Sequence, residues 1–157
     1  MTEQPEAFVR DAREEDLPRI LVLLHQLSQS SSHPEEAVRG VGDEHRAILK
    51  GFLGDRHFHL LVLEAGGEIQ GALHLYVLPS MSRGGPPWAV VEHVVVDEHQ
   101  RSRGYGELLM AEAIRIAKEA GSQRMSLGSN LRRMDSHRFY ERLGFQASQK
   151  GFVLGLD

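Results

Sequence analysis

The 157-residue sequence contains no cysteine, which excludes disulfide bonds, thiolate metal sites and cysteine nucleophiles. No apolar run approaches the roughly 20 residues that a membrane-spanning helix requires, and the acidic N-terminal residues do not resemble a secretory signal. The formal net charge is −4, so a broad basic surface for nucleic acid is not favoured. We therefore expect a cytoplasmic protein that binds neither membrane nor nucleic acid.

Length and composition predict one globular domain over residues 1–157. The hydrophobic content is 41% and the charged content is 25%, both ordinary for a chain that packs a core. β-Branched runs alternate with stretches whose apolar residues recur every three or four positions, which is typical of strands alternating with helices. The sequence therefore predicts an α/β or α+β fold.

Several elements are predicted from local patterns. One helix has an apolar face that begins at Leu17, and a second helical region opens at Pro34. A hairpin turns at Gly66–Gly67. Towards the end of the chain, a helix stops at Gly144, and a last strand is expected from Phe145 roughly to Leu154.

The stretch from Val90 to Gly106 organises the chain. Val90–Val96 is almost entirely β-branched, as in a packed strand, and the pattern Arg101-x-x-Gly104-x-Gly106 follows it. A helix that begins in such a loop directs free N–H groups and the positive end of its dipole toward one point, which favours a phosphate. The residues after Gly106 fit neither the P-loop, which needs Lys-Ser/Thr, nor the dinucleotide fingerprint, which needs a third glycine.

The loop pattern resembles the acetyl-CoA loop of the GNAT superfamily of N-acetyltransferases, which reads Arg/Gln-x-x-Gly-x-Gly/Ala. Three other segments are similar to parts of the same family. Phe8–Leu17 resembles its first strand and the start of its first helix, and Leu61–Gly71 resembles its hairpin that ends in Ile-x-Gly. Arg138–Phe145 is similar to its Phe-Tyr-Glu-x-x-Gly-Phe signature. The order and spacing of these segments match along nearly the whole chain.

The resemblance implies a GNAT-type mixed and strongly bent sheet of about six to seven strands, splayed between strands 4 and 5 and flanked by about four helices. The pantetheine arm of acetyl-CoA would lie in this wedge. The backbone of Val94, Val95 and Val96 would pair with its amides like an added strand. The pyrophosphate would be held by the loop residues Arg101, Ser102, Arg103, Gly104, Tyr105 and Gly106.

Acetyl transfer to an amine needs a base for the ammonium proton and an acid for the leaving thiolate. Glu92 is our candidate base, because it stands in an otherwise apolar strand, where a desolvated carboxylate binds a proton more strongly. The alternative is a structural Glu92 that pairs with an arginine or a histidine. In a regular strand, the neighbouring His93 would point to the opposite face, although a bulge would change this.

Tyr140 is our candidate acid, because a phenol with a pKa of about 10 suits the protonation of a thiolate. In the family, the tyrosine of this Phe-Tyr pair faces the sulfur of CoA. The alternative is a core aromatic residue, since Phe139 and Tyr140 both lie on the apolar side of the predicted helix.

Other polar residues are less specific. His57 and His59 would share one face of a strand, but no third ligand follows nearby, so we expect no metal. His25, Tyr76 and Trp88 are candidates for the acceptor pocket, against the alternative of ordinary packing. An acidic pocket for a cationic acceptor could use Glu35, Glu36, Asp43 and Glu44. A CoA contact could come from Asn130, Arg132 and Arg133, against the alternative of a solvated turn.

The sequence therefore predicts an N-acetyltransferase that moves an acetyl group from acetyl-CoA to a primary amine of a small molecule or peptide by direct attack in a ternary complex. The alternative is a non-catalytic acyl-CoA-binding or regulatory module on the same fold. Retention of both Glu92 and Tyr140 favours the enzyme. A nucleotide-binding protein is a third and weaker hypothesis. The resemblance leaves a homodimer open and does not identify the acceptor.

Overall fold

The computed structural model describes residues 6–29 and 40–157. The chain divides into two compact units, Met1–Leu127 and Gly128–Asp157, and each is described by itself. Within the described residues, no helix is both long enough and apolar enough to span a bilayer. The expectation of one domain over residues 1–157 stays a prediction.

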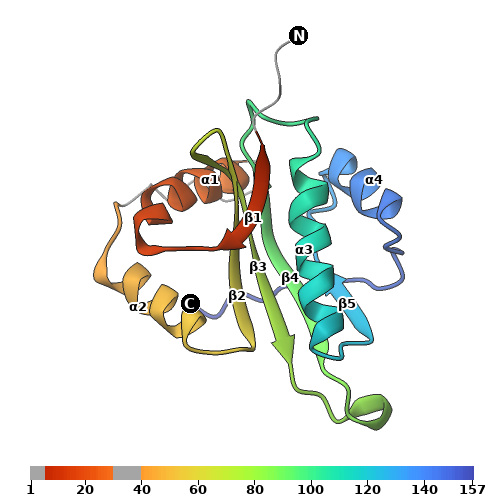
Figure 1. The fold of residues 1–157 in the computed structure, drawn as a ribbon. Coiled ribbons are helices and arrows are strands. Elements are labelled where there is room, and N and C mark those ends of the chain that lie inside the picture. Colours follow the sequence, from red (N-terminus) through yellow and green to blue (C-terminus); the bar gives the residue numbers. More distant parts are fainter. Residues whose placement is uncertain (1–5, 30–39) are drawn as a thin grey trace. The chain divides into compact units, whose positions relative to one another are not determined.

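A mixed sheet of five strands forms the centre of the first unit, in the order β1-β2-β3-β4-β5 (Figure 1). Neighbours among β1 to β4 are antiparallel, whereas β5 runs parallel to β4. The prediction of a mixed sheet in an α+β fold is thus confirmed. The strands are β1 (Ala7–Asp11), β2 (Phe58–Ala65), β3 (Glu68–Leu78), β4 (Trp88–Val96) and β5 (Arg124–Leu127).

The described residues also form four α-helices and two short 3₁₀ turns, η1 and η2. The predicted start of the second helical region at Pro34 lies outside the described residues, and the described part of that region begins after Gly42. The elements are η1 (Glu14–Asp16), α1 (Leu17–Gln29), α2 (Asp43–Leu53), η2 (Ser82–Gly84), α3 (Tyr105–Glu119) and α4 (Met134–Arg142).

The predicted last strand from Phe145 to Leu154 is wrong. Residues 145–157 form neither helix nor strand, and their apolar side chains at Phe152 and Leu156 are exposed. The described residues therefore make a five-stranded sheet instead of the six to seven strands expected. β-Branched and aromatic composition favours an extended chain, but a strand also needs a partner for its backbone N–H and C=O groups, and composition does not supply one.

Helices cover both faces of the sheet. Leu23 of α1 and Leu49 of α2 share a buried cluster with Ala72 of β3. The preceding residue, Gly71, faces the other side, where a Cβ atom would lie 2.9 Å from Cδ1 of Leu109 in α3. The glycine of the Ile-x-Gly motif therefore lets α3 pack closely against the sheet.

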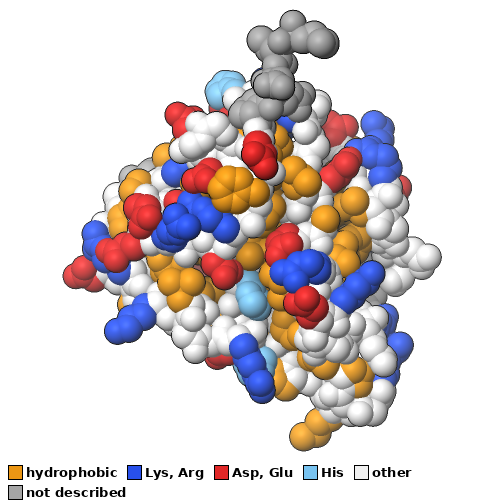
Figure 2. Space-filling model, in the orientation of Figure 1, with side chains coloured by type: hydrophobic (Ala, Val, Ile, Leu, Met, Phe, Trp, Pro, Cys, Tyr) orange, Lys and Arg blue, Asp and Glu red, His pale blue; other side chains and the backbone are white. Residues whose placement is uncertain are grey.

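An ion-pair network joins β1 to η1 and β2. Arg10 Nη1 lies 2.7 Å from Asp16 Oδ2, and Arg10 Nη2 lies 3.3 Å from Glu64 Oε1. Burial would raise the pKa of Asp16, but hydrogen bonds from Arg10 and from the Arg13 N–H hold it below its ordinary value. Acidic and basic side chains lie interspersed over β1 and the neighbouring helices (Figure 2), so this part of the surface carries no field of one sign.

Candidate functional site

Strand β4 bulges beside Glu92. Its register pairs Val95 with Ala72 of β3 and Glu92 with His74, so β4 contains one residue more than β3 over this interval. His93 lies within the bulge and has φ 53°, in the left-handed region that non-glycine residues rarely adopt. Such bulges redirect side chains and are common beside functional sites.

The bulge brings His93 to the face that carries Glu92. His74 pairs directly with Glu92, and the ring of His93 packs against the ring of His74 at a centroid distance of 4.9 Å. The strand is therefore not regular here, and the structure has the bulge that was named as the alternative to opposite faces for His93 and Glu92. This bulge changes the alternation of side chains by one position.

Electrostatic effects also place Glu92 near this face. The negative charge of Glu92 adds to burial in raising the pKa of Tyr76, which keeps the phenol protonated. Burial, together with the nearby His93, lowers the pKa of His74 to about 4, so the His74 imidazole is neutral near pH 7. Within the described part of the chain, His74 Nδ1 is buried and has no hydrogen-bond partner.

Four rings from three elements form a connected group that includes His74, the residue paired with Glu92. Phe52 of α2 contacts Phe58 of β2 and both His74 and Tyr76 of β3, at centroid distances of 5.7, 5.6 and 6.0 Å. Sequence analysis named Tyr76 but missed the other three rings. The His-x-Tyr alternation of β3 could have indicated His74, whereas Phe52 and Phe58 join the group only through folding.

Pairing between β4 and β5 covers only the first part of β4. The register runs from Trp88 with Arg124 to Val91 with Leu127, where β5 ends. Strand β4 continues to Val96. Within the described residues, the backbone of Val94–Val96 is therefore not paired with β5. This part of the strand includes the residues predicted to pair with pantetheine.

Trp88 helps to hold the paired part of β4 and β5 together. Its indole Nε1–H donates a hydrogen bond to Ser126 Oγ at 3.0 Å, and the guanidinium of Arg124 lies 4.6 Å from the centroid of its ring. These contacts favour the packing interpretation of Trp88 over a role in an acceptor pocket.

The loop after β4 is anchored to α1. Asp97 is buried, forms an ion pair with Arg19, and accepts a hydrogen bond from the His99 N–H at 2.8 Å. Burial would raise the pKa of Asp97, but the His99 N–H and Arg19 together lower it. The beginning of the predicted phosphate loop is thus fixed to the fold by a charged pair.

The remainder of the loop presents backbone N–H groups at the start of α3. Arg101 to Gly104 are exposed, and Ser102 and Gly104 have φ values of 65° and 81°. Gly104 is the N-cap of α3 and makes no side-chain cap, so the first N–H groups of the helix have no intrahelical partner. Left-handed turns that lead into a helix form a concave anion site. The predicted loop therefore has suitable backbone geometry, with Tyr105 buried beneath it.

Tyr140 belongs to the second unit, where it lies near the end of α4. Its ring contacts Phe139 and Phe145 at centroid distances of 5.1 and 5.9 Å. The Phe145 N–H donates a hydrogen bond to the Tyr140 carbonyl at 3.0 Å, and Gly144 has φ 100°. The Phe-Tyr-Glu-x-x-Gly-Phe string thus ends a helix with a left-handed glycine and fixes the aromatic residues around Tyr140.

The turn before α4 is held by Asn130. Its side-chain Oδ1 accepts a hydrogen bond from the Arg132 N–H at 2.9 Å, and its carbonyl accepts one from the Arg133 N–H at 3.0 Å. The same carbonyl lies 2.8 Å from His137 Nε2. These bonds give Asn130 a structural role in this turn.

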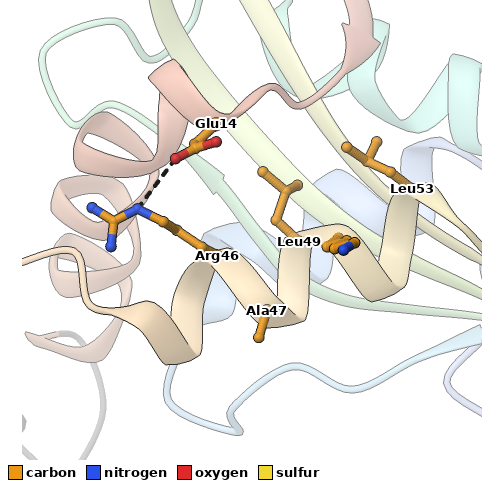
Figure 3. A pocket seen from close by; sticks show the side chains of 6 residues that line it. Glu14, Arg46, Ala47, Leu49 and Leu53 are labelled. Carbon is orange, nitrogen blue, oxygen red and sulfur yellow. Dashed lines mark ion pairs between the residues drawn. The ribbon is translucent and has the colours of Figure 1, made fainter.

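A shallow pocket of about 370 Å³ lies between η1 and α2 (Figure 3). Glu14 and Arg46 point toward each other at its edge, with Arg46 Nε 3.2 Å from Glu14 Oε1. The other lining residues, Ala47, Leu49, Lys50 and Leu53, all come from α2. The pocket therefore includes no residue of β4 or of the loop that follows it.

The histidines of the His57-x-His59 pattern contact groups near them in sequence. His57 Nδ1 lies 2.8 Å from Asp55 Oδ1, and His59 Nε2 lies 3.1 Å from the Arg56 carbonyl. Across residues 6–29 and 40–157, no group of three or more His, Asp or Glu side chains is arranged to hold a metal ion. Of the acidic acceptor candidates, Glu35 and Glu36 lie outside the described residues, and Asp43 and Glu44 form the first turn of α2.

Comparison with known proteins finds similar chains that match over nearly their whole length. A glucosamine 6-phosphate N-acetyltransferase from Trypanosoma brucei brucei is 28% identical over 156 residues, which cover 99% of this chain and 100% of that protein. An aminoalkylphosphonate N-acetyltransferase from Salmonella typhimurium is 26% identical, with coverage of 97% and 93%. The solved structure of a transcriptional regulator from Bacillus halodurans C-125 matches with a TM-score of 0.85 at 28% identity, covering 96% of this chain and 100% of that one.

The match to a family extends over most of the chain. Residues 9–145 match the sequence model of the acetyltransferase (GNAT) family, which uses acetyl-CoA as co-substrate. This range includes β4 with its bulge, the loop that follows it and α4. The chain therefore belongs to the acetyltransferase (GNAT) family and is an acetyl-CoA-dependent N-acetyltransferase.

Proposed function

We propose that this enzyme transfers the acetyl group of acetyl-CoA directly to a primary amine of a small molecule or peptide, with both substrates bound together. The observation that carries the proposal is the bulge of β4 at Glu92–His93, because it lies between the end of β5 pairing and the anion-binding loop. A thioester that extends from the loop along β4 would reach Glu92.

The loop between β4 and α3 binds the pyrophosphate of acetyl-CoA. The N–H groups at the start of α3 point outward, and the side chains of Arg101 and Arg103 are exposed beside them. Backbone donors give direction, and guanidinium groups add charge-assisted hydrogen bonds. The proposed contacts with the pyrophosphate come from Arg101, Ser102, Arg103, Gly104, Tyr105 and Gly106.

The pantetheine arm would follow the unpaired edge of β4. An amide chain needs a strand edge with free N–H and C=O groups, and the backbone of Val94, Val95 and Val96 offers one beyond the end of β5. Its reactive end would then lie at the bulge. A backbone N–H in this region would polarise the thioester carbonyl.

The reaction needs a proton acceptor and a proton donor. Glu92 takes one proton from the substrate ammonium, directly or through water, and the freed nitrogen lone pair forms a bond to the carbonyl carbon. As the tetrahedral intermediate collapses, the carbon–sulfur bond breaks, and Tyr140 donates a proton to the leaving thiolate. The nitrogen releases its second proton to solvent as the amide forms, and the Tyr140 phenolate regains a proton from solvent. Both residues retain the side chains that these roles need, which favours an enzyme over a non-catalytic acyl-CoA-binding module.

The names of two relatives indicate small acceptors. One relative is named for glucosamine 6-phosphate and another for aminoalkylphosphonates, and both compounds carry an amine on a small body. We therefore regard a small-molecule amine as the first acceptor class to test. A peptide amine is the second.

The test measures binding and turnover separately. Isothermal titration should show acetyl-CoA binding, and a thiol-release assay with a panel of small amines and peptides should show amine-dependent CoA formation. CoA binding without amine-dependent release from any member of the panel would instead support the non-catalytic module.

A further inference from the structure

Aromatic and imidazole side chains cluster on the acceptor side of the proposed site. Five aromatic or imidazole side chains form one connected group on the face that carries Glu92, and we call this group the ring wall. The contacts that join its members have centroid distances between 4.9 and 6.4 Å. The ring wall consists of Phe52, Phe58, His74, Tyr76 and His93.

The ring wall is positioned to meet an incoming amine. Glu92 pairs across the sheet with His74, and its carboxylate lies close enough to Tyr76 to act on the phenol. In the described part of the chain, Phe52, Phe58 and Tyr76 are half-buried, so each retains accessible surface. When the amino group of a substrate approaches Glu92 from this face, the rest of the substrate would therefore contact the rings.

The charge around the ring wall suits a cation. The ionisable groups that act electrostatically on Tyr76 and His74 are Glu92 and His93, and neither lysine nor arginine is among them. His74 is neutral near pH 7, because its pKa is about 4. Lys50 is two residues before Phe52 on α2, so it faces a different direction, and it lines the pocket between η1 and α2. Among the described residues that act on Tyr76 and His74, a phosphate beside Glu92 would therefore find no cationic partner.

We infer that the preferred acceptor is a primary amine on an aromatic, uncharged body, bound with its ammonium at Glu92 and its ring against the ring wall. This inference rests on the proposed function and names the substrate class of that site. Aromatic pairs favour edge-to-face and offset contacts, which the five rings offer. An ammonium is attracted by the faces of aromatic rings as well as by the Glu92 carboxylate. Phosphorylated and phosphonylated amines are correspondingly poor acceptors, in contrast with those that name the two relatives.

The experiment compares three matched probes in the thiol-release assay with saturating acetyl-CoA. These probes are phenethylamine, n-butylamine and 2-aminoethylphosphonate. We expect the kcat/KM of phenethylamine to exceed that of each of the other two by about tenfold. Phe52→Leu removes one ring while keeping an apolar side chain, and it should lower kcat/KM about fivefold for phenethylamine but less than about twofold for n-butylamine.

Phe8→Leu is the matched control, because Phe8 is an exposed ring on β1 outside the ring wall. It should change neither value. If Phe52→Leu does not fold, as judged by thermal unfolding, Tyr76→Leu supplies the same comparison.

The outcomes separate this inference from the proposed function. A kcat/KM for 2-aminoethylphosphonate that equals or exceeds that of phenethylamine would overturn the inference while leaving acetyl transfer intact. An equal loss for both phenethylamine and n-butylamine in Phe52→Leu would also overturn it, since the ring would then be structural. Absence of thiol release with every amine, despite acetyl-CoA binding, would overturn the proposed function and this inference together.

Discussion

The imidazole rings of His74 and His93 meet edge to face across β3 and β4, with centroids 4.9 Å apart and planes inclined by 70°. His93 reaches this position because the β4 bulge turns its backbone into the left-handed region. Burial and the proximity of His93 hold the pKa of His74 at about 4. His74 is thus half-buried and neutral near pH 7, whereas His93 is exposed.

This pair predicts how stability depends on pH. The unfolded His74 takes up a proton near pH 6.5, whereas the folded one takes it up near pH 4. Acidification between these values therefore favours the unfolded chain, and His74 stabilises the fold only above this window. Its contribution at pH 7 should be lost by pH 4, to the extent of about 3 kcal/mol.

The variant His74→Phe keeps a ring in place but removes the titration. Urea unfolding at pH 7 and pH 4 should show a smaller loss of stability in His74→Phe than in the wild type. His99→Gln is the control, because the His99 side chain is exposed, and it should retain the wild-type difference. An unchanged pH dependence in His74→Phe would show that His74 is not the responsible group.

Arg19 is predicted to be the main support of the loop that follows β4. It forms an ion pair with buried Asp97, and its Nε donates a hydrogen bond to the Ile69 carbonyl at 2.8 Å. Arg19→Met leaves the Asp97 carboxylate without this partner and should lower the free energy of unfolding by about 2 kcal/mol at pH 7. Arg115→Met, which breaks exposed pairs on α3, should cost much less stability than Arg19→Met.

The Arg19 variant should also change the acid response. The folded pKa of Asp97 is below its ordinary value of 3.8, so the ionised carboxylate stabilises the fold above that value and loses this effect as the pH falls through the folded pKa. Urea unfolding of Arg19→Met should therefore show a weaker decline of stability below about pH 4 than the wild type does. Equal declines would assign the acid sensitivity to other carboxylates.

Gly104 is predicted to serve both the fold and the cofactor, whereas Gly121 serves only the fold. Their φ values are 81° and 84°, and a Cβ atom at either position would meet no atom within 4 Å. Alanine at either site should therefore cost about 1 kcal/mol of stability through backbone strain alone. Only Gly104→Ala should weaken the binding of acetyl-CoA, because it shifts N–H groups that bind the pyrophosphate. Its Kd for acetyl-CoA should rise about tenfold in a titration. Equal effects on Kd would place the pyrophosphate elsewhere.

The local parts of the site could be predicted from the sequence. A β-branched run, two glycines in a basic loop and a helix-forming stretch are all short-range signals, and each lies where the structure has β4, the loop and α3. The Phe-Tyr-Glu-x-x-Gly-Phe string likewise ends α4, whose C-cap is Leu143, directly before Gly144. These predictions succeeded because propensity and glycine geometry act within a few residues.

Features that depend on distant partners could not be predicted in the same way. The position of the β4 bulge is set by its register with β3, so the face of His93 follows only from pairing. Phe52 meets His74 and Tyr76 because α2 folds onto the sheet, and no spacing in the sequence shows this. The last predicted strand failed for a related reason, since an apolar extended segment such as Phe152–Leu154 needs a neighbouring edge.

Tyr140→Phe tests the proposed general acid. The substitution removes one hydroxyl and keeps the ring contacts with Phe139 and Phe145, so the end of α4 should remain intact. We expect kcat to fall by about 10²-fold or more, with little change in the Kd of acetyl-CoA. Phe139→Leu is a structural control that removes a ring but no hydroxyl. If Tyr140→Phe loses affinity for acetyl-CoA while kcat is kept, the tyrosine is a binding or packing residue.

Glu92→Gln tests the proposed base and separates it from a structural carboxylate. Glutamine keeps the size of the side chain and its place in β4 but cannot accept the ammonium proton. At low pH nearly all of the amine is protonated, so the rate should fall most there, by about 10²-fold, and recover partly at high pH as free amine accumulates. A pH–rate profile from about pH 6 to 10 provides the measurement, with Glu98→Gln in the exposed turn after β4 as the control. An equal fold-loss of rate at every pH would show that Glu92 only positions the substrate. Raising the pH deprotonates the amine and can therefore compensate only for a lost proton acceptor.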